Sequence, residues 1–214
     1  KTISIIIRCL NEAEHIGRLL SGIQQQTVQP CEVIVVDSGS TDATVEIAGR
    51  FGARIVTISP QQFTFGRSLN IGCDAASGDI LVIASAHVYP IYSDWLEAIA
   101  RPFEDETIAL TYGRQQGDHR TRFSEQQVFA KWFPSRSVDH QGHPFCNNAN
   151  AAVRRSVWQT LPYDEALTGL EDMDWARKVM ALGHGLSYVA EAPVAHIHNE
   201  RFPQIKNRYR REAI

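Results

Sequence analysis

The sequence lacks the features that mark several large classes of protein. It has 21 Lys and Arg against 24 Asp and Glu, a net charge of −3, so no basic excess points to nucleic acid binding. No apolar run approaches the ~20 residues of a membrane-spanning helix, and no signal peptide precedes the first apolar segment. We expect a cytoplasmic protein without a transmembrane segment, and peripheral association with the cytoplasmic face of a membrane stays open.

Cysteine motifs and glycine-rich phosphate loops are also missing. The cysteines show no CxxC spacing, which favours free thiols in a reducing compartment over disulfides; they are Cys9, Cys31, Cys73 and Cys146. No GxGxxG follows the first apolar segment and no GxxxxGK[ST] occurs in the chain. These absences argue against a dinucleotide-binding oxidoreductase and a P-loop NTPase.

What the sequence does contain is a regular alternation of strand and helix signals. Apolar segments predict strands at residues 2–9, 32–37, 54–58, 80–85 and 107–112. Between them, apolar side chains recur with helical spacing, for example at Ile16, Leu19, Leu20 and Ile23. Such connections are too long for hairpins, so we expect βαβ units around a mainly parallel sheet.

The second half of the chain is less regular. Residues 114–148 are polar with one weak helical stretch at 123–133, and a long irregular segment inside a compact domain is often a functional loop. A strand at 149–153, helices at 156–161 and 171–182, and a last strand at 186–189 are predicted to follow. No repeat or linker interrupts the chain, so one domain is expected.

The most informative segment runs from residue 32 to residue 44. Four β-branched residues at 33–36 predict a strand buried on both faces, and this strand ends at Asp37. Small polar residues then lead into a helix and offer N-cap oxygens. Because α/β proteins bind ligands at the carboxyl ends of their parallel strands, we expect Asp37 to face a ligand.

Other polar side chains fall near the same predicted sheet edge. Asn11 and Glu12 follow the first strand, either as turn residues or as partners of Asp37 in binding a base and a ribose. Arg67 begins a helix, where a cation is unfavourable unless an anion such as a diphosphate compensates it; the alternative is a solvated surface residue. His87 follows the strand at 80–85, and its place beside Asp37 and Arg67 favours a role in the site over a structural one.

Two acidic residues and a histidine pair stand in the last part of the chain. Glu171 and Asp172 open the helix at 171–182, either as complements of the helix dipole or as a general base. A helix N-terminus lowers the pKa of a carboxylate, so an effective base there needs burial to raise it again. His196 and His198 alternate as on a strand, which puts both imidazoles on one side as half of a metal site.

Taken in order, these motifs resemble one known family. The first strand ends in NEAEHI, and VIVVDSGSTDAT, FGRSLNIG, SAHVYP, NNANAAVRR, GLEDMDWARKV and an HxH pair follow. This order is similar to that of the inverting family 2 glycosyltransferases of the GT-A fold, and it covers the chain up to about residue 200. The resemblance implies an α/β fold, a three-layer α/β/α sandwich with a central, mainly parallel (mixed) sheet.

The resemblance also implies how the chain is divided and where it works. Residues 1–200 would form the GT-A glycosyltransferase domain, with a nucleotide-binding half at about 1–113 and an acceptor and catalytic half at about 114–200. Residues 201–214 would begin a C-terminal helical extension whose truncation is left open. The expected setting is polysaccharide biosynthesis in the cytoplasm.

By the same resemblance, individual residues receive roles toward a nucleotide-sugar donor and a hydroxyl acceptor. Asp172 would be the base that deprotonates the acceptor, and Glu171 would support it. A UDP-sugar is the default donor, although thymine would pair with Asp37 equally well; the nucleotide would contact Leu10, Asn11, Glu12, Asp37, Ser38, Arg67, Ser85 and Ala86. The donor sugar and a glycan, lipid-linked or small-molecule acceptor would border Asn147, Asn148, Asn150 and Trp132, although Trp132 can equally pack the loop down.

One motif departs from the family pattern. The family usually has Asp-x-Asp after the fourth strand, where the carboxylates hold a divalent metal bound to the diphosphate; here Ser85, Ala86 and His87 stand in its place. Imidazole favours Mn²⁺ over Mg²⁺, so we expect His87 with His196 or His198 to bind Mn²⁺. The alternative is metal-independent transfer, with Arg67 and basic C-terminal residues neutralising the leaving group.

Two other functions stay open at this point. The lost Asp-x-Asp makes a catalytically silent nucleotide- or glycan-binding GT-A domain credible. A nucleotidyltransferase on a similar sheet is the second alternative, but it would usually need a loop rich in Gly and in Lys or Arg after the first strand. Residues 10–13, Leu-Asn-Glu-Ala, do not provide one.

Overall fold

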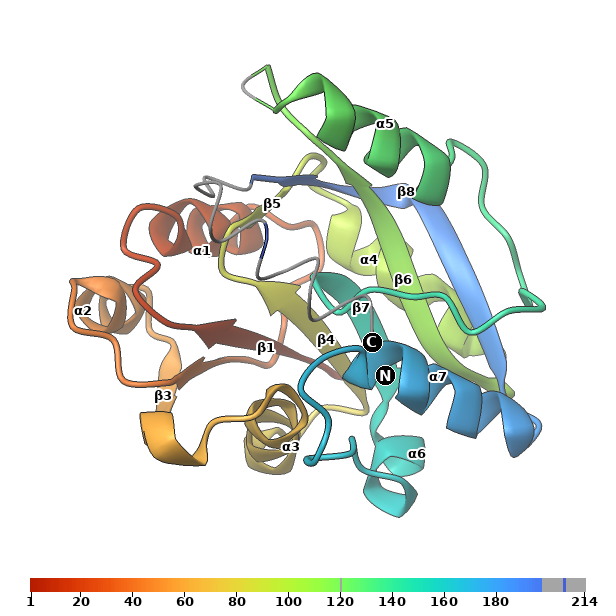
Figure 1. Ribbon diagram of the computed structural model, residues 1–214, viewed down its shortest axis with the longest axis horizontal. Coiled ribbons are helices and arrows are strands. Elements are labelled where there is room, and N and C mark those ends of the chain that lie inside the picture. Colours follow the sequence, from red (N-terminus) through yellow and green to blue (C-terminus); the bar gives the residue numbers. More distant parts are fainter. Residues whose placement is uncertain (120, 198–205, 207–214) are drawn as a thin grey trace.

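The computed structural model describes residues 1–119, 121–197 and 206, and its strands form one sheet with the order β3-β2-β1-β4-β7-β6-β8-β5 (Figure 1). The strands are β1 (Ile3–Cys9), β2 (Glu32–Asp37), β3 (Arg54–Thr57), β4 (Ile80–Ser85), β5 (Val88–Pro90), β6 (Ile108–Gln116), β7 (Asn150–Arg154) and β8 (Gly185–His196). All of them run in one direction except β5 and β7. The sheet is therefore mixed and mainly parallel.

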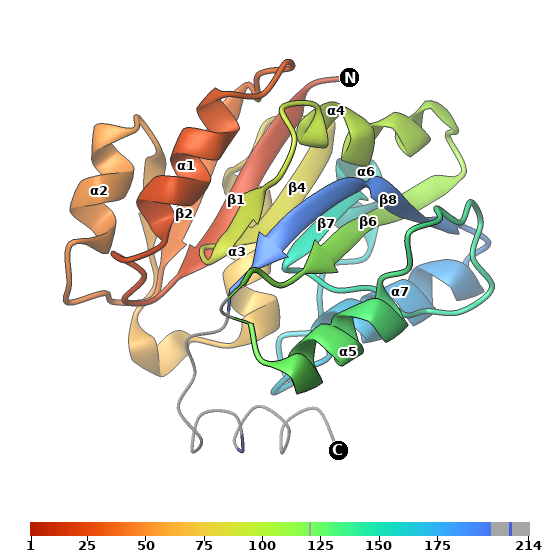
Figure 2. The same ribbon diagram turned by 90° about the horizontal axis from the view of Figure 1, so that it is seen from above.

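Helices cover both faces of this sheet (Figure 2). One face carries α1 (Ile16–Gln24), α2 (Thr44–Arg50) and α4 (Trp95–Ala100). The other carries α3 (Phe65–Ala75), α5 (Phe123–Trp132), α6 (Arg155–Thr160) and α7 (Glu171–Ala181). Short 3₁₀ turns, η1 (Pro60–Gln62) and η2 (Arg101–Glu104), complete the described helical segments.

Strand β1 shows why the chain folds into three layers. Ile5 and Ile7 pack into the core under α1, while Ile6 between them packs into the core under α3, and all three are fully buried. Successive side chains of a strand point to opposite faces, so a run of isoleucines fills two cores at once. Each fully buried isoleucine contributes about 1.5–3 kcal/mol through removal of apolar surface from water.

The predicted fold class is confirmed, and three strands differ from their predictions. β8 continues to His196 instead of ending at residue 189, and β6 continues to Gln116. Polar residues at 114–116 and Glu191 and Pro193 interrupt the apolar pattern from which strand length was predicted, and the pairing of the two strands shifts register after Gly113. β5, which contains Pro90, was not among the predicted strands; it is an edge strand, and an edge tolerates a residue without an N–H.

The sequence predicts free cysteines in place of disulfides, and no membrane-spanning segment. The four cysteines are free, as predicted, with Cys31 exposed and the other three buried. Burial raises the pKa of the Cys9 and Cys73 thiols, so both are inert in the core. Within the described part of the chain, no helix has the length and apolarity that crossing a bilayer would require.

The topology brings distant residues together at one edge of the sheet. β1, β4, β6 and β8 are parallel to one another, so their carboxyl ends meet there. β7 runs in the opposite direction between β4 and β6, so its first residue lies at this same edge. α7 also begins there, and the site is built around this edge.

Candidate active site

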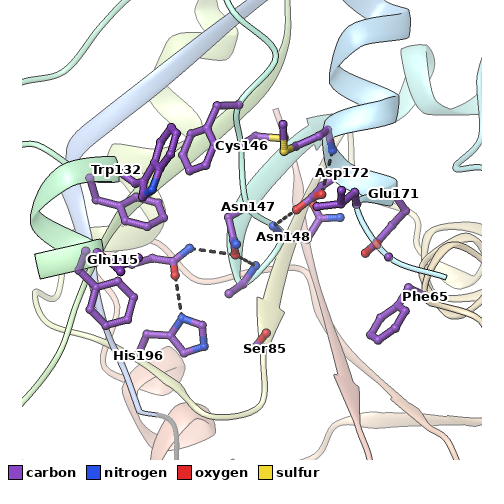
Figure 3. Close-up of a pocket in the computed structure, with 18 of the residues that line it drawn as sticks. Phe65, Ser85, Gln115, Trp132, Cys146, Asn147, Asn148, Glu171, Asp172 and His196 are labelled. Atoms are coloured by element: carbon purple, nitrogen blue, oxygen red, sulfur yellow. Dashed lines mark hydrogen bonds between the residues drawn. The ribbon is translucent and has the colours of Figure 1, made fainter. Parts of the chain in front are cut away.

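A cavity of about 530 Å³ opens at this edge of the sheet (Figure 3). Strand ends contribute Arg8, Ser85, Gln115 and His196 to its wall. His87, between β4 and β5, also lines the cavity, and further polar lining comes from the segment before β7 and the start of α7, namely Asn147, Asn148, Glu171 and Asp172. A concave site with several convergent polar groups is the usual place for catalysis or ligand binding.

Asp172 combines access to the cavity with a perturbed acidity. One carboxylate oxygen accepts a hydrogen bond from the backbone N–H of Asn148 at 3.2 Å, and the other accepts one from Met173 at 2.8 Å. Burial, and next the charge of Glu171, raise the pKa of Asp172 to about 6, although these hydrogen bonds lower it. A carboxylate of this acidity is suited to accept a proton near neutral pH.

The neighbouring carboxylate has a different environment. Glu171 is 5% exposed, and its Oε1 accepts a hydrogen bond from Nη1 of Arg8 at 3.3 Å. Asp172 has no such cation within the same contact distance among the described residues. The two adjacent carboxylates thus divide into one ion-paired group and one group that faces the cavity with backbone donors only.

The turn before these carboxylates is strained. Leu170 lies in the left-handed region with φ of +59° and lines the cavity directly before α7. A bulky side chain adopts this conformation only when its surroundings hold it there. This conformation sets the direction in which Glu171 and Asp172 enter the cavity.

A chain of hydrogen bonds fixes the orientation of His196. The amide oxygen of Asn147 accepts hydrogen bonds from the backbone N–H of Ala149 at 2.9 Å and from Nε2 of Gln115 at 3.0 Å. Gln115 therefore presents its Oε1 to Nδ1 of His196, 2.7 Å away (Figure 3). An amide oxygen only accepts, so Nδ1 of His196 carries a proton.

His87 is oriented in a similar way. Its Nδ1 lies 2.9 Å from Oε1 of Glu12, a carboxylate that fixes the proton on this nitrogen. The rings of His87 and His196 stack with centroids 5.1 Å apart and planes at 27°. Both imidazoles therefore turn Nδ1 toward an oxygen acceptor, which fixes the orientation of each ring.

An aromatic wall closes the side of the cavity opposite the carboxylates. Trp132 on α5 (Figure 3) stacks on Phe145 with ring centroids 4.7 Å apart, and Phe129 and Phe133 also line the cavity. Trp132 is 45% exposed, and Nζ of Lys131 lies 5.1 Å from its ring centroid, so the ring packs the loop and is partly accessible. Aromatic rings of this kind suit the apolar faces of a bound organic molecule.

Asn148 is the least satisfied polar group of the cavity. Its residue is 3% exposed, and neither the oxygen nor the nitrogen of its side-chain amide makes a hydrogen bond with the described residues. Buried polar groups are nearly always paired, so an amide without partners beside Asp172 indicates a ligand position. A sugar hydroxyl, which both donates and accepts, matches such an amide.

Comparisons with known proteins agree with this geometry. The family model described as glycosyl transferase family 2 matches residues 4–161. This chain belongs to that family. The motif order predicted the same membership, which is thereby confirmed.

Curated relatives of this family 2 chain include two O-antigen chain rhamnosyltransferases. WbaN of Salmonella anatum is 32% identical over 199 residues, covering 87% of this chain and 62% of the relative. RfbN of Salmonella typhimurium is 31% identical over 211 residues, covering 92% of this chain and 67% of the relative. The chain thus spans about two thirds of the length of these relatives.

Solved structures similar to the family 2 chain share its fold. The mannosyltransferase PcManGT from Pyrobaculum calidifontis, in complex with GDP-Man and Mn²⁺, matches with a TM-score of 0.76 and 21% identity over 97% of this chain and 60% of that one. Glucosyl-3-phosphoglycerate synthase from Mycobacterium tuberculosis, with Mn²⁺, UDP and glucosyl-3-phosphoglycerate, matches with a TM-score of 0.71 and 23% identity over 98% and 76%. Both likenesses concern the fold.

Several residues predicted for the nucleotide lie in the loops beside the cavity. The carboxylate of Asp37 is 3% exposed and accepts hydrogen bonds from the backbone N–H groups of Gly39 and Ser40, so it stabilises its own turn. Asn11 bonds across to Thr41 with its amide oxygen at 2.8 Å. Leu10 is exposed, whereas Ser38 and Ala86 are buried and none of the three lines the cavity. Their contacts with a nucleotide stay predictions.

Three further predicted residues are placed away from the cavity or outside the described part. Arg67 has a side chain 43% exposed, with Nε 3.9 Å from Glu165, and does not line the cavity. Asn150 lies in the core, where its amide bonds Trp95, Arg114 and Ala192, because a buried amide takes the backbone partners nearest to it. His198 lies outside the described residues.

The structure adds site residues that sequence reasoning missed. Arg8 and Gln115 lie within strands, each one position before the end of its strand, β1 and β6 respectively. The signal for Arg8 is an arginine between Ile7 and Cys9 in an otherwise apolar strand, since a charge there needs a partner. Gln115 carried no such signal, because it lay in the segment predicted as an irregular loop.

Proposed function

We propose that this family 2 chain is an inverting glycosyltransferase domain that moves a sugar from a nucleotide-sugar donor to a hydroxyl acceptor. The observation that carries the proposal is Asp172, a cavity-facing carboxylate whose pKa is raised to about 6. A hydroxyl group becomes a stronger nucleophile when a base takes its proton during attack. The names of the curated relatives, O-antigen chain rhamnosyltransferases, support this class of reaction.

In the proposed reaction, the acceptor hydroxyl lies between Asp172 and the anomeric carbon of the donor. As the oxygen attacks from one face of the sugar, Asp172 accepts its proton, the new glycosidic bond forms and the bond to the diphosphate breaks on the opposite face. The sugar is transferred with inversion. The amide of Asn148, whose backbone N–H bonds the same carboxylate, would hold a hydroxyl of the acceptor or the sugar beside it.

The identity of donor and acceptor is part of the proposal. The relatives' names, O-antigen chain rhamnosyltransferases, favour a rhamnosyl donor and a glycan acceptor in polysaccharide biosynthesis. The acceptor would be a glycan, a lipid-linked molecule or a small molecule, and the reaction would take place on the cytoplasmic side. Uracil and thymine present the same imide face, so uridine and thymidine diphosphates are both candidates. Trp132 would contact a sugar ring. Residues from about 114 to 200 would form the acceptor and catalytic half, and residues from about 1 to 113 the nucleotide-binding half.

A divalent metal fits this site only in part. The rings of His87 and His196 lie 5.1 Å apart, but no group of three or more His, Cys, Asp or Glu side chains that could hold a metal occurs in the described ranges. Two imidazoles bind a metal weakly on their own, so the diphosphate oxygens would have to complete the coordination. The metal would offset the charge of the leaving diphosphate, and nitrogen ligands favour Mn²⁺ over Mg²⁺.

A thermal-shift screen tests donor and metal together. The chain is heated with UDP, dTDP and GDP, each with and without Mn²⁺ or Mg²⁺. We expect one nucleoside diphosphate to raise Tm, more strongly with Mn²⁺ than with Mg²⁺, and Mn²⁺ alone to have little effect, because a ligand stabilises the fold only to the extent that it binds.

The screen separates the alternatives. Stabilisation by a nucleoside diphosphate that is independent of any metal would contradict the metal proposal and favour transfer without one. No stabilisation by any of the three would contradict the nucleotide-sugar proposal itself. Binding of a donor without release of its diphosphate in the presence of acceptor extracts would favour the catalytically silent domain.

A further inference from the structure

Arg8 is a cation in an unusual position. It lies on β1 between two buried residues, and its side chain reaches the cavity wall with 17% of its surface exposed. Among the described residues that line the cavity, no other arginine or lysine occurs. A charge in the interior of a protein is costly unless it is paired, so the contacts of the guanidinium indicate its role in the site.

The contacts of Arg8 anchor one side of the guanidinium. Its Nη1 donates to the carbonyl oxygen of Phe65 at 3.1 Å and to Oε1 of Glu171 at 3.3 Å, and the group lies 5.4 Å from the Phe65 ring centroid. Its Nε and Nη2 make no hydrogen bond with the described residues. The Nε–Nη2 edge is the part of arginine that binds a phosphate with two parallel hydrogen bonds.

The neighbour of Arg8 in the sheet keeps this edge available. β1 and β4 pair in parallel with Arg8 beside Ser85, and both residues line the cavity. A carboxylate at position 85 would stand next to the guanidinium and compete for it, whereas a serine hydroxyl carries no charge. Arg8 and Ser85 together make this strand-end position cationic.

Arg8 is a positive charge in a cavity that also contains two acidic residues. Glu171 and Asp172 line the same wall, and their carboxylates repel a bound diphosphate. Arg67, the arginine predicted from sequence for the diphosphate, lies outside the cavity beside Glu165. A diphosphate bound in this cavity would therefore meet Arg8 as its nearest arginine.

We propose that Arg8 binds the diphosphate of the donor through its Nε–Nη2 edge, while Glu171 and the Phe65 carbonyl hold the guanidinium in place. The inference rests on the proposed function, since it requires a nucleoside diphosphate donor. It makes Arg8 the residue that distinguishes a nucleoside diphosphate from the bare nucleoside. The side chain of Arg8 would then contact both the diphosphate leaving group, through Nε and Nη2, and Glu171, through Nη1.

The test measures affinities by calorimetric titration, with the nucleoside diphosphate (UDP, dTDP or GDP) that most stabilises the wild type and with its bare nucleoside. Arg8→Gln should weaken binding of the diphosphate at least tenfold and leave nucleoside binding within twofold. Arg8→Lys, which keeps the charge but loses the two-donor edge, should fall between them. If Arg8→Gln does not fold, Arg8→Lys supplies the result, with at least threefold weaker diphosphate binding.

Two matched controls separate phosphate binding from a structural role. Arg67→Gln should leave diphosphate affinity within twofold, because that arginine faces Glu165. Glu171→Gln removes the negative charge but keeps an Oε1 that can accept the hydrogen bond from Arg8 Nη1, so the guanidinium stays in place and diphosphate binding should be retained or tightened. A loss in Glu171→Gln as large as in Arg8→Gln would show that only the ion pair matters and would overturn the inference.

The remaining outcomes are also decisive. Unchanged diphosphate affinity in both Arg8 variants would overturn the inference while leaving the proposed function intact. A wild type that binds none of the three nucleoside diphosphates would overturn both.

Discussion

At the scale of single residues, two adjacent carboxylates have different environments. Glu171 is held by Arg8, whereas Asp172 has backbone donors and a neighbouring negative charge. Burial and that charge raise the pKa of Asp172 to about 6, which overcomes the opposing effect of its position in the first turn of α7. The sequence predicts that a base at this helix N-terminus is effective only if burial raises its pKa. The burial of Asp172 meets this condition.

This raised pKa has a consequence for stability. The native state binds the proton of Asp172 more tightly than the unfolded chain, whose ordinary value is 3.8, so the free energy of unfolding falls as pH rises from about 4 to 6 and the cost is fully present at pH 8. Asp172→Asn removes the charge. Its Tm should exceed that of the wild type by a few degrees at pH 8, and the difference should shrink as pH is lowered from 6 to 4.

Asp174 on the same helix is the matched control. Burial alone would raise the pKa of Asp174, but hydrogen bonds from Lys178 and Arg177 hold this pKa below its ordinary value. Asp174→Asn should therefore lower Tm slightly at pH 8 or leave it unchanged. A Tm of Asp172→Asn at or below that of the wild type at pH 8 would contradict the raised pKa.

At the scale of elements, a glycine sets how closely α3 approaches the segment before α7. A Cβ built on Gly66 would lie 2.2 Å from the backbone oxygen of Asp164, and a backbone carbonyl cannot move aside as a side chain can. Gly66 thus lets α3 lie against the chain that leads to Leu170 and Asp172. The sequence placed Gly66 in the FGRSLNIG motif, and the structure gives the reason for it.

Gly66→Ala should lower the free energy of unfolding by about 1–3 kcal/mol, the usual cost of overpacking. Gly49→Ala is the control, because a Cβ there meets nothing within 4 Å and alanine is the better helix former, so it should stabilise by about 0.5–1 kcal/mol. Urea unfolding of both variants measures the difference. Equal stability of the two variants would show that the close approach at Gly66 has no energetic weight.

The elements also show how far the sequence alone could lead. The strands at 2–9, 32–37 and 80–85 were predicted because β-branched runs buried on both faces have a distinct pattern, and their ends located Ser85 and His87 at the cavity. Pairing direction has no local pattern, so the antiparallel β7 was not predicted. The edge strand β5 and the full length of β8 were missed because Pro90 in the first, and Glu191 and Pro193 in the second, interrupt the apolar pattern.

The site was predictable where a polar residue follows a strand and less so elsewhere. Glu171 and Asp172 carried a motif, and the structure places both at the cavity. For Asp37 and Asn150, the sequence marks a polar side chain near the sheet edge, but whether backbone groups or a ligand satisfy it depends on the tertiary fold. Arg8 and Gln115 lie inside strands, and only the assembled sheet shows that they reach the cavity.

At the scale of the whole molecule, the cavity is assembled from residues between 8 and 196, which the sheet topology gathers at one edge (Figure 1). The reversed strand β7 is essential to this arrangement, since its first residue rather than its last lies at the edge and brings Asn147 and Asn148 to the start of α7. The proposed chemistry therefore depends on the complete fold of the described domain.

The measurement that tests the central claim most directly is the comparison of wild type and Asp172→Asn with the donor that binds. Donor affinity and the rate of nucleoside diphosphate release in the presence of acceptor are measured on the same preparations. Loss of a general base should lower turnover by about 10²–10⁴-fold while donor affinity stays within twofold. A turnover of Asp172→Asn close to that of the wild type would contradict the account.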